Sequence, residues 1–199
     1  MAQSEVNKMV KAQQSYSVEQ IEQMTRLWVE TMVVGLNLCP FAAPVVKDET
    51  LRFAITDADN DAALTRAFLA EVERLLAADE QTISTTLFIV PTGLEDFYDY
   101  LDHLRLFESL LQQAGLEGVL QLASFHPGYL FAGVAADDLS HWSNRAPWPT
   151  FHLIREAEVS RALAHYAHPE QIPERNIKRL RALGRDALIA RFPPFADYC

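Results

Sequence analysis

The stretch Thr86-Leu87-Phe88-Ile89-Val90 is continuously apolar and runs into Pro91-Thr92-Gly93-Leu94-Glu95. A short apolar run that ends in a turn is typical of a strand buried on both faces of a sheet. Thr92 and Glu95 have the spacing of a helix capping box, which predicts a helix directly after the turn. A buried strand that leads into a helix indicates an α/β fold.

Two further apolar runs, at residues 51–56 and 119–124, lie on either side of this strand in the sequence. Helical stretches at about 60–78 and 94–114 separate the three runs, and this order predicts a βαβαβ unit. Crossovers that contain a helix favour parallel, right-handed connections. The run at 51–56 alternates in polarity, so we expect it nearer an edge of the sheet. We therefore predict a small, mainly parallel sheet flanked by helices.

Additional helices are expected at both ends of this unit. Ser17 and Gln20 form a capping box, and helical spacing continues to about Val34. Helical patterns also cover 153–166 and 172–183. We predict one α/β domain over residues 17–192, between a disordered N-terminal tail at 1–16 and a C-terminal tail at 193–199.

The composition excludes several classes of protein. Of 199 residues, 49% are hydrophobic, which is enough for an ordinary packed core. The formal net charge of -10 opposes attraction to nucleic acid or to anionic lipid, so we expect neither as a partner. The longest apolar stretch, 33–46, is short and contains two prolines, which argues against a membrane-spanning helix.

Cysteine usage indicates a reducing compartment. Cys39 and Cys199 are the only two cysteines and are far apart in the sequence, which makes a structural disulfide a poor prediction. The polar stretch 1–17 lacks the pattern of a secretory signal. We therefore expect reduced thiols and a cytoplasmic protein.

Cys39 is the first candidate for chemistry. It precedes Pro40, and the residue before a proline is pushed out of the helical region, which predicts a tight turn after the first helix. Its thiol could serve as a nucleophile or as a soft metal ligand. Alternatively, it is a small buried apolar filler, as free cysteines commonly are.

The carboxyl ends of the strands indicate where a ligand would bind. In open parallel sheets, ligands bind at this edge, which here holds the 91–95 turn and the long loop that begins at His126. We expect His126 to act as a general base or metal ligand, or else to pack beneath the turn. Tyr129, Asn144 and Arg145 in the same loop are candidates for binding a small, anionic substrate, although Arg145 could instead form a salt bridge.

His152 and Glu156 have the spacing of neighbours on one face of the helix expected at 153–166. Such a pair could bind a metal, or the carboxylate could orient the imidazole, or the two could be a simple surface pair. A site formed by Cys39, His126, His152 and Glu156 would suit zinc, the commonest ion with mixed sulfur and nitrogen ligands.

The loop at 125–150 supports an alternative from another functional class. It carries two tryptophans and further aromatic side chains together with an arginine. These residue types are enriched at the centres of protein interfaces. The alternative is therefore a non-catalytic module that binds a protein or peptide. The leading hypothesis remains an enzyme that acts on a small anionic metabolite through a cysteine, histidine and arginine site.

Three separated segments resemble a family catalogued as domain of unknown function 1415. These segments are 35–42, 123–131 and 144–156, and the likeness extends over about 18–183. Ala146 stands where the family pattern has serine, so we assign no hydroxyl chemistry there. The resemblance implies an ordinary single-domain cytoplasmic protein, and it implies no particular mechanism.

Overall fold

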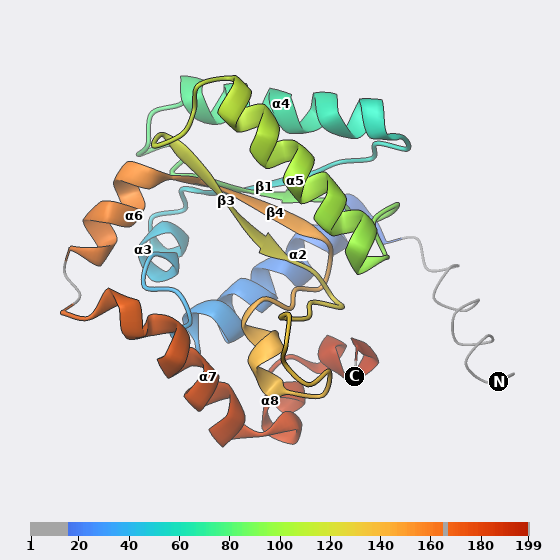
Figure 1. The fold of residues 1–199 in the computed structure, drawn as a ribbon, viewed down its shortest axis with the longest axis vertical. Coiled ribbons are helices and arrows are strands. Elements are labelled where there is room, and N and C mark those ends of the chain that lie inside the picture. Colours follow the sequence, from blue (N-terminus) through green and yellow to red (C-terminus); the bar gives the residue numbers. More distant parts are fainter. Residues whose placement is uncertain (1–15, 165–166, 199) are drawn as a thin grey trace, which may run out of the picture.

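The computed structural model describes residues 16–164 and 167–198. This part of the chain forms one α/β domain around a mixed sheet with the strand order β1-β2-β4-β3. The strands are β1 (Leu51–Ile55), β2 (Thr85–Ile89), β3 (Leu120–Phe125) and β4 (Thr150–Arg155). Helices α4 (Asp61–Ala77) and α5 (Phe97–Gln113) cover one face of the sheet, and α2 (Val18–Trp28) and α3 (Ala42–Lys47) lie against the other (Figure 1).

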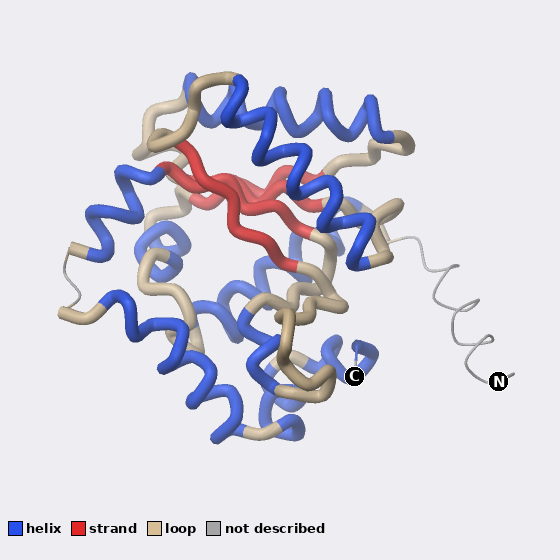
Figure 2. Tube along the Cα trace, in the orientation of Figure 1, coloured by secondary structure: helices blue, strands red, loops and turns tan. Residues whose placement is uncertain are grey.

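The remaining elements extend the layer on the α2 side of the sheet (Figure 2). A π-helix, η1 (Val29–Val34), continues α2 without a break. After β4 come α6 (Glu156–Leu163), α7 (Ile172–Leu183) and α8 (Arg185–Arg191). Short 3-10 helices η2 (Leu139–Ser143), η3 (Pro169–Gln171) and η4 (Pro193–Tyr198) lie in the connections and at the end of the described chain.

Side-chain caps mark where α2, α4 and α5 begin. The capping box of Ser17 and Gln20 is present at the start of α2, as predicted. Helix α5 differs, because its N-cap is Asp96, whose carboxylate accepts hydrogen bonds from two backbone N–H groups of the first turn. Glu95 instead accepts a hydrogen bond from the N–H of Gly93 at 3.0 Å. The capping box predicted from Thr92 is therefore replaced by a cap that begins the helix a few residues later.

The prediction of a mainly parallel sheet was wrong. Only β1 and β2 pair in parallel, whereas β4 is antiparallel to both β2 and β3. The three predicted strands do run in one direction, as their helical crossovers require. However, β4 occupies the place between β2 and β3, so these two strands never become neighbours. The edge position of β1 and the central position of β2 are confirmed.

The element that the sequence analysis missed is β4. The segment 150–155 was expected to lead into and begin a helix over 153–166, but it forms a strand, and α6 starts only at Glu156. The strand hydrogen-bonds to a neighbour on each side, and four of its six residues are buried. Tertiary pairing thus overrides the helical spacing that the sequence shows in this segment.

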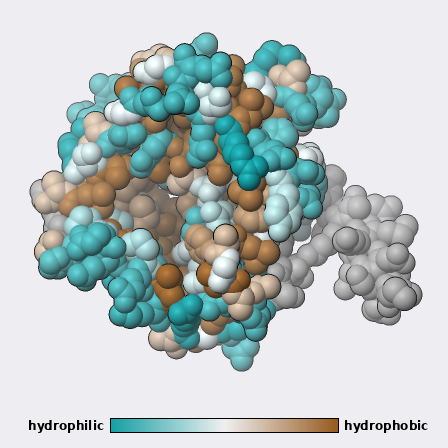
Figure 3. All heavy atoms as spheres, viewed as in Figure 1, coloured by the Kyte–Doolittle hydropathy of each residue, from teal (hydrophilic) through white to brown (hydrophobic). Residues whose placement is uncertain are grey.

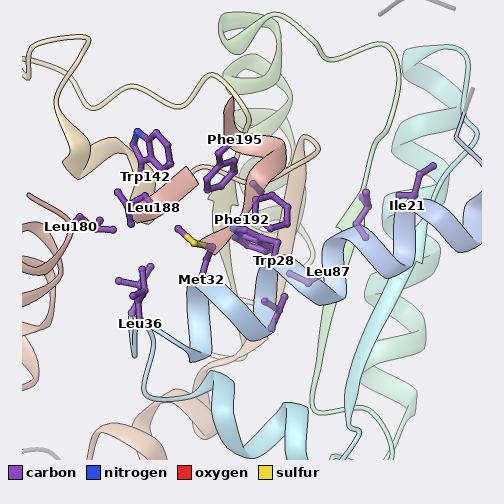
Figure 4. Close-up of a cluster of buried hydrophobic side chains, with 14 residues drawn as sticks. Ile21, Trp28, Met32, Leu36, Leu87, Trp142, Leu180, Leu188, Phe192 and Phe195 are labelled. Atoms are coloured by element: carbon purple, nitrogen blue, oxygen red, sulfur yellow. The ribbon is translucent and has the colours of Figure 1, made fainter. Parts of the chain in front are cut away.

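Two large apolar clusters hold the layers together. Figure 4 shows the cluster on the α2 side, where Trp28 and Met32 meet side chains from the C-terminal helices. Trp142 and Phe195 pack edge to face there, with ring centroids 4.9 Å apart. Because Phe195 is fully buried, the segment predicted as a C-terminal tail at 193–199 packs onto the domain as far as the structure describes it.

Two other predictions concern the N-terminal tail and a membrane-spanning helix. The predicted tail at 1–16 lies almost wholly outside the described residues. Within 16–164 and 167–198, no helix is both long and apolar enough to cross a membrane. Figure 3 shows hydrophilic residues over most of the outer helices on the face drawn, with hydrophobic residues visible chiefly in the recess between them.

Candidate functional site

A small cavity of about 50 Å³ lies between the sheet and the segment that joins η1 to α3. Cys39 and His152 both lie on its wall. The rest of the wall is apolar and is formed by Trp28, Val29, Val33, Phe41, Ala42, Val45, Leu51, Leu87 and Phe125. A thiol and an imidazole therefore share one apolar cavity, which has room for a few heavy atoms.

The π-helix η1 shapes one side of this cavity. The N–H of Gly35 bonds to the carbonyl of Glu30 at 2.9 Å, which is the wider hydrogen-bond spacing of a π-helix. Segments of this kind are rare and are frequently found at functional sites. Val29 and Val33 of this segment both line the cavity.

Helix α7 holds the turn that carries Cys39. Side chains from one face of α7 donate hydrogen bonds to the backbone carbonyls of the three residues that precede the cysteine. Arg179 donates to Leu36, Arg175 to Asn37 at 2.9 Å, and Asn176 to Leu38 at 2.7 Å. Arg175, Asn176 and Arg179 of α7 therefore have a structural role inside the domain. They also fix the backbone directly before the thiol.

Burial controls the ionisation of Cys39. The side chain is partly exposed at the cavity and is a free thiol. Its apolar surroundings raise the pKa of the thiol, and the backbone N–H groups of Phe41 and Ala42 oppose this by a smaller amount. The resting side chain is therefore a neutral thiol, which reacts as a nucleophile only when a nearby base takes its proton.

His152 is the titratable side chain that lines this cavity together with Cys39. Its Nε2 lies 2.7 Å from the hydroxyl oxygen of Thr85, which also donates a hydrogen bond to the carbonyl of Leu153. Burial lowers the pKa of His152 to about 3, so the imidazole is neutral at physiological pH. The cavity thus holds a neutral thiol and a neutral imidazole, and proton transfer between them would create charge only during a reaction.

His126 lies where the sequence predicted, at the end of β3, and both of its ring nitrogens are hydrogen-bonded to backbone. Nε2 lies 2.9 Å from the carbonyl of Leu94, and Nδ1 accepts from the N–H of Gly128 at 3.0 Å. The two loops at the carboxyl ends of β2 and β3 therefore meet, as expected. Burial lowers the pKa of His126 and favours the neutral ring that this pair of bonds requires.

The three predicted substrate-binding residues lie in the same loop as His126. The hydroxyl of Tyr129 is 3.2 Å from that of Ser124, and the side chain of Asn144 donates to the Ser124 carbonyl at 3.0 Å. Arg145 is only 7% exposed, and its guanidinium lies 5.7 Å from the ring centroid of Trp142. None of the three lines the cavity of Cys39 and His152.

The four predicted metal ligands do not form one site, although Cys39 and His152 line the same cavity. His152 lies in the middle of β4, so it does not share a helix face with Glu156, which starts α6. Glu156 lines a separate open groove beside α5 and β3, and His126 is absent from the wall that Cys39 shares with His152. Across the described residues, no three histidine, cysteine or acidic side chains are grouped so that they could hold a metal ion.

The aromatic loop is packed against the domain. Trp142 is 1% exposed and belongs to the core cluster on the α2 side, and Trp148 packs against the same cluster. Buried aromatic side chains of this kind hold a loop in place, and they do not offer the exposed patch that an interface needs.

Sequence reasoning identified Cys39 and His152 but assigned His152 to a helix, and it missed Thr85 altogether. The segment Thr150-Phe151-His152-Leu153-Ile154 is rich in β-branched and aromatic residues and follows two prolines, which is a strand signal. As a strand, it would place His152 on one sheet face with Thr150 and Ile154. Thr85 carries no signal of its own, because threonine is common in strands.

The structure defines the class of this protein as a single-domain α/β protein with a mixed sheet and an apolar cavity that contains a thiol and an imidazole. The family described as "Protein of unknown function (DUF1415)" matches residues 20–190, and the chain belongs to this family. The family expected from the three sequence segments is thus confirmed.

A search of curated proteins shows similarity to "Vacuolar fusion protein MON1 homolog A" of Gallus gallus. The identity is 31% over 112 residues, which cover 49% of this chain and 20% of that protein. The match therefore spans about a fifth of the length of this relative. No solved structure matches the chain.

Proposed function

We propose that this protein is a thiol-dependent enzyme that acts on a small molecule, with Cys39 as the nucleophile and His152 as the proton acceptor. The observation that carries the proposal is that both side chains line one apolar cavity. A nucleophile and a base in one concave site are the minimum for covalent catalysis by a thiol. The proposal replaces His126 with His152 as the partner of Cys39.

The wall of the cavity indicates the kind of substrate. Apart from Cys39 and His152, all of its lining side chains are apolar, and Arg145 is not among them. Burying a charge against such a wall without a partner would be strongly unfavourable. The group that enters the cavity is therefore uncharged and apolar, such as a short acyl group, in place of the anionic group that Arg145 suggested.

The reaction that these residues support is acyl transfer. The Sγ of Cys39 bonds to the carbonyl carbon of the substrate while the thiol proton moves to His152. The bond from that carbon to the leaving oxygen or sulfur then breaks, and the proton passes from His152 to the leaving atom. The products are an S-acyl Cys39 and a free alcohol or thiol, and water or a second acceptor then removes the acyl group.

His126, Tyr129, Asn144 and Arg145 have a different task in this proposal. The hydrogen bonds of His126, Tyr129 and Asn144 fix the loop that follows β3 to the end of that strand and to the turn after β2. Arg145 lies over the ring of Trp142 in the same loop. Phe125, which closes one side of the cavity, directly precedes this loop. We propose that these four residues support the site from outside and do not touch the substrate.

The free thiol of Cys39 is also relevant to the cellular compartment of the protein. Cys39 is unpaired in the structure, and a nucleophilic thiol persists best in a reducing compartment. We propose a cytoplasmic location on this ground. The alternative of a protein-binding module based on the aromatic loop has less support, since Trp142 is buried in the core.

The test is acylation by p-nitrophenyl acetate, a small uncharged ester that releases a coloured product. We expect wild type and Cys199→Ser to release a burst of nitrophenolate and to carry one acetyl group on Cys39 by mass spectrometry. Cys39→Ser should lose both signals, and His152→Gln should slow the burst by about a hundredfold, as loss of a general base does. Acetylation confined to Cys199, or equal bursts in wild type and Cys39→Ser, would overturn the proposal.

A further inference from the structure

The geometry points to Thr85 as a positioning residue that fixes which nitrogen of His152 carries the proton. The hydrogen bonds of Thr85 are present whatever the protein does. Only the consequence for catalysis rests on the proposed function. Thr85 and His152 lie on the same face of adjacent strands, since β2 and β4 pair Thr85 with Ile154 and Leu87 with His152. The two side chains are thus diagonal neighbours across the ladder.

Counting hydrogens decides the direction of each bond. The hydroxyl of Thr85 contacts two groups, the carbonyl oxygen of Leu153 and Nε2 of His152. It has a single proton, and the carbonyl oxygen can only accept one. The hydroxyl therefore donates to Leu153, and its oxygen accepts the remaining bond from an N–H at Nε2 of His152.

The opposite arrangement would place two acceptors against each other. If the hydroxyl proton were directed at His152, the oxygen of Thr85 and the carbonyl oxygen of Leu153 would be in contact with no proton between them. Thr85 and Leu153 are both fully buried, and a buried acceptor without a donor is unfavourable because it has lost its bond to water. The hydrogen-bond chain from His152 through Thr85 to Leu153 therefore has one favourable direction.

The consequence for chemistry concerns Nδ1 of His152. With the proton held at Nε2, Nδ1 keeps its lone pair and is the atom that can accept a proton. The hydrogen bonds found within the described residues include none at this nitrogen. When the thiol proton of Cys39 moves to Nδ1, the N–H at Nε2 stays bonded to Thr85, so the ring does not have to turn during the reaction.

The electrostatic setting limits how strong this base is. Among the described residues, the ring contacts a hydroxyl and no carboxylate, and no other side chain on the cavity wall carries a charge, since the thiol of Cys39 is neutral. A carboxylate in the place of Thr85 would favour a charged imidazole. Thr85 instead orients a neutral ring, which suits a site that must stay uncharged until a substrate is bound.

The first experiment observes the proton directly by NMR on the full-length chain with ¹⁵N-labelled histidine, with His152→Gln used to assign the ring signals. We expect a one-bond N–H correlation at Nε2 of His152 in wild type and in Thr85→Ser. We expect this correlation to disappear in Thr85→Val, because the proton then exchanges with water. A proton on Nδ1 in wild type, or an unchanged Nε2 signal in Thr85→Val, would overturn the inference.

The second experiment connects the ring to the reaction. The burst rate of Cys39 with p-nitrophenyl acetate should fall by about tenfold or more in Thr85→Val and return in Thr85→Ser. The wild-type NMR spectrum decides the tautomer even if Thr85→Val does not fold. A wild-type protein with the proton on Nε2 but no acylation at Cys39 would refute the proposed function alone, whereas acylation with the proton on Nδ1 would refute the role of Thr85 alone.

Discussion

Asn176 on α7 donates a hydrogen bond of 2.7 Å to the backbone carbonyl of Leu38, the residue that precedes Cys39. Asn176 is 8% exposed, so the bond is shielded from water. The two residues are far apart in the sequence, and the contact connects the C-terminal helices to the candidate site. The C-terminal third of the chain therefore takes part in building the cavity.

The first prediction concerns this bond. Asn176→Ala removes the donor and leaves the Leu38 carbonyl buried without a partner, which should lower the free energy of unfolding by about 1–3 kcal/mol. Cys39 should also react faster with iodoacetamide, because its turn is released. Lys178→Ala on the same helix is the control, since its side chain is 74% exposed and should change stability by less than about 0.5 kcal/mol. Equal effects of the two variants in urea titrations would contradict this reading.

The second prediction concerns Gly35, the residue that ends the π-helix. A Cβ added there would collide with the carbonyl oxygen of Thr31, which is backbone and cannot move aside easily. We expect Gly35→Ala to destabilise the protein by about 1–3 kcal/mol, as overpacking does. Gly128→Ala is the matched control, because its Cβ would meet the ring of His126 at an ordinary 3.5 Å. Thermal unfolding of both variants tests this, and an unaffected Gly35→Ala would show that the turn has room to relax.

The sequence predicted the local elements well, and it failed where the answer depended on distant partners. Strands β1, β2 and β3 and the helices between them follow from apolar runs and helical spacing, and helix α7 matches its predicted bounds. The position of β4 could not be derived in this way. Its insertion between β2 and β3 is a long-range choice, and that choice alone turns a parallel sheet into a mixed one.

In the candidate site, too, the sequence predicted the local features but not the contacts between distant segments. Cys39 was expected in a turn after the first helix, and it is there, because Pro40 and the end of η1 act locally. The expected partner of the thiol changed from His126 to His152 once β4 was placed. Thr85 became visible only through its hydrogen bond across two strands. Pairings between strands are thus the part of the site that the sequence did not reveal.

The third prediction concerns the ionisation of Cys39. Burial raises the pKa of this thiol, so its alkylation by iodoacetamide should reach half of its maximal rate at a higher pH than that of free cysteine. The Cys199→Ser variant isolates the signal of Cys39, and mass spectrometry at a series of pH values measures the rate. A midpoint below that of free cysteine would show a thiolate at rest and would contradict the neutral pair described for the cavity.

The fourth prediction concerns the stability of the fold against acid. In the folded protein, burial lowers the pKa of His152 to about 3, whereas an unfolded histidine titrates near 6.5. Between these values the unfolded chain binds more protons than the folded one, so stability rises with pH and is lost as pH falls below about 6.5. For one such group, the loss between pH 7 and pH 5 is about 2 kcal/mol.

Urea denaturation at these two pH values tests this in wild type and in His152→Gln, which cannot titrate. We expect wild type to lose about 2 kcal/mol more than the variant on acidification. His168→Gln is the control for removing an imidazole, because His168 has a side chain that is 67% exposed, and it should behave as wild type does. If wild type and His152→Gln lose stability equally, His152 is accessible to protons in the folded state. The cavity would then be wetter than its apolar wall implies, and a charged imidazole would have to be considered as the resting partner of Cys39.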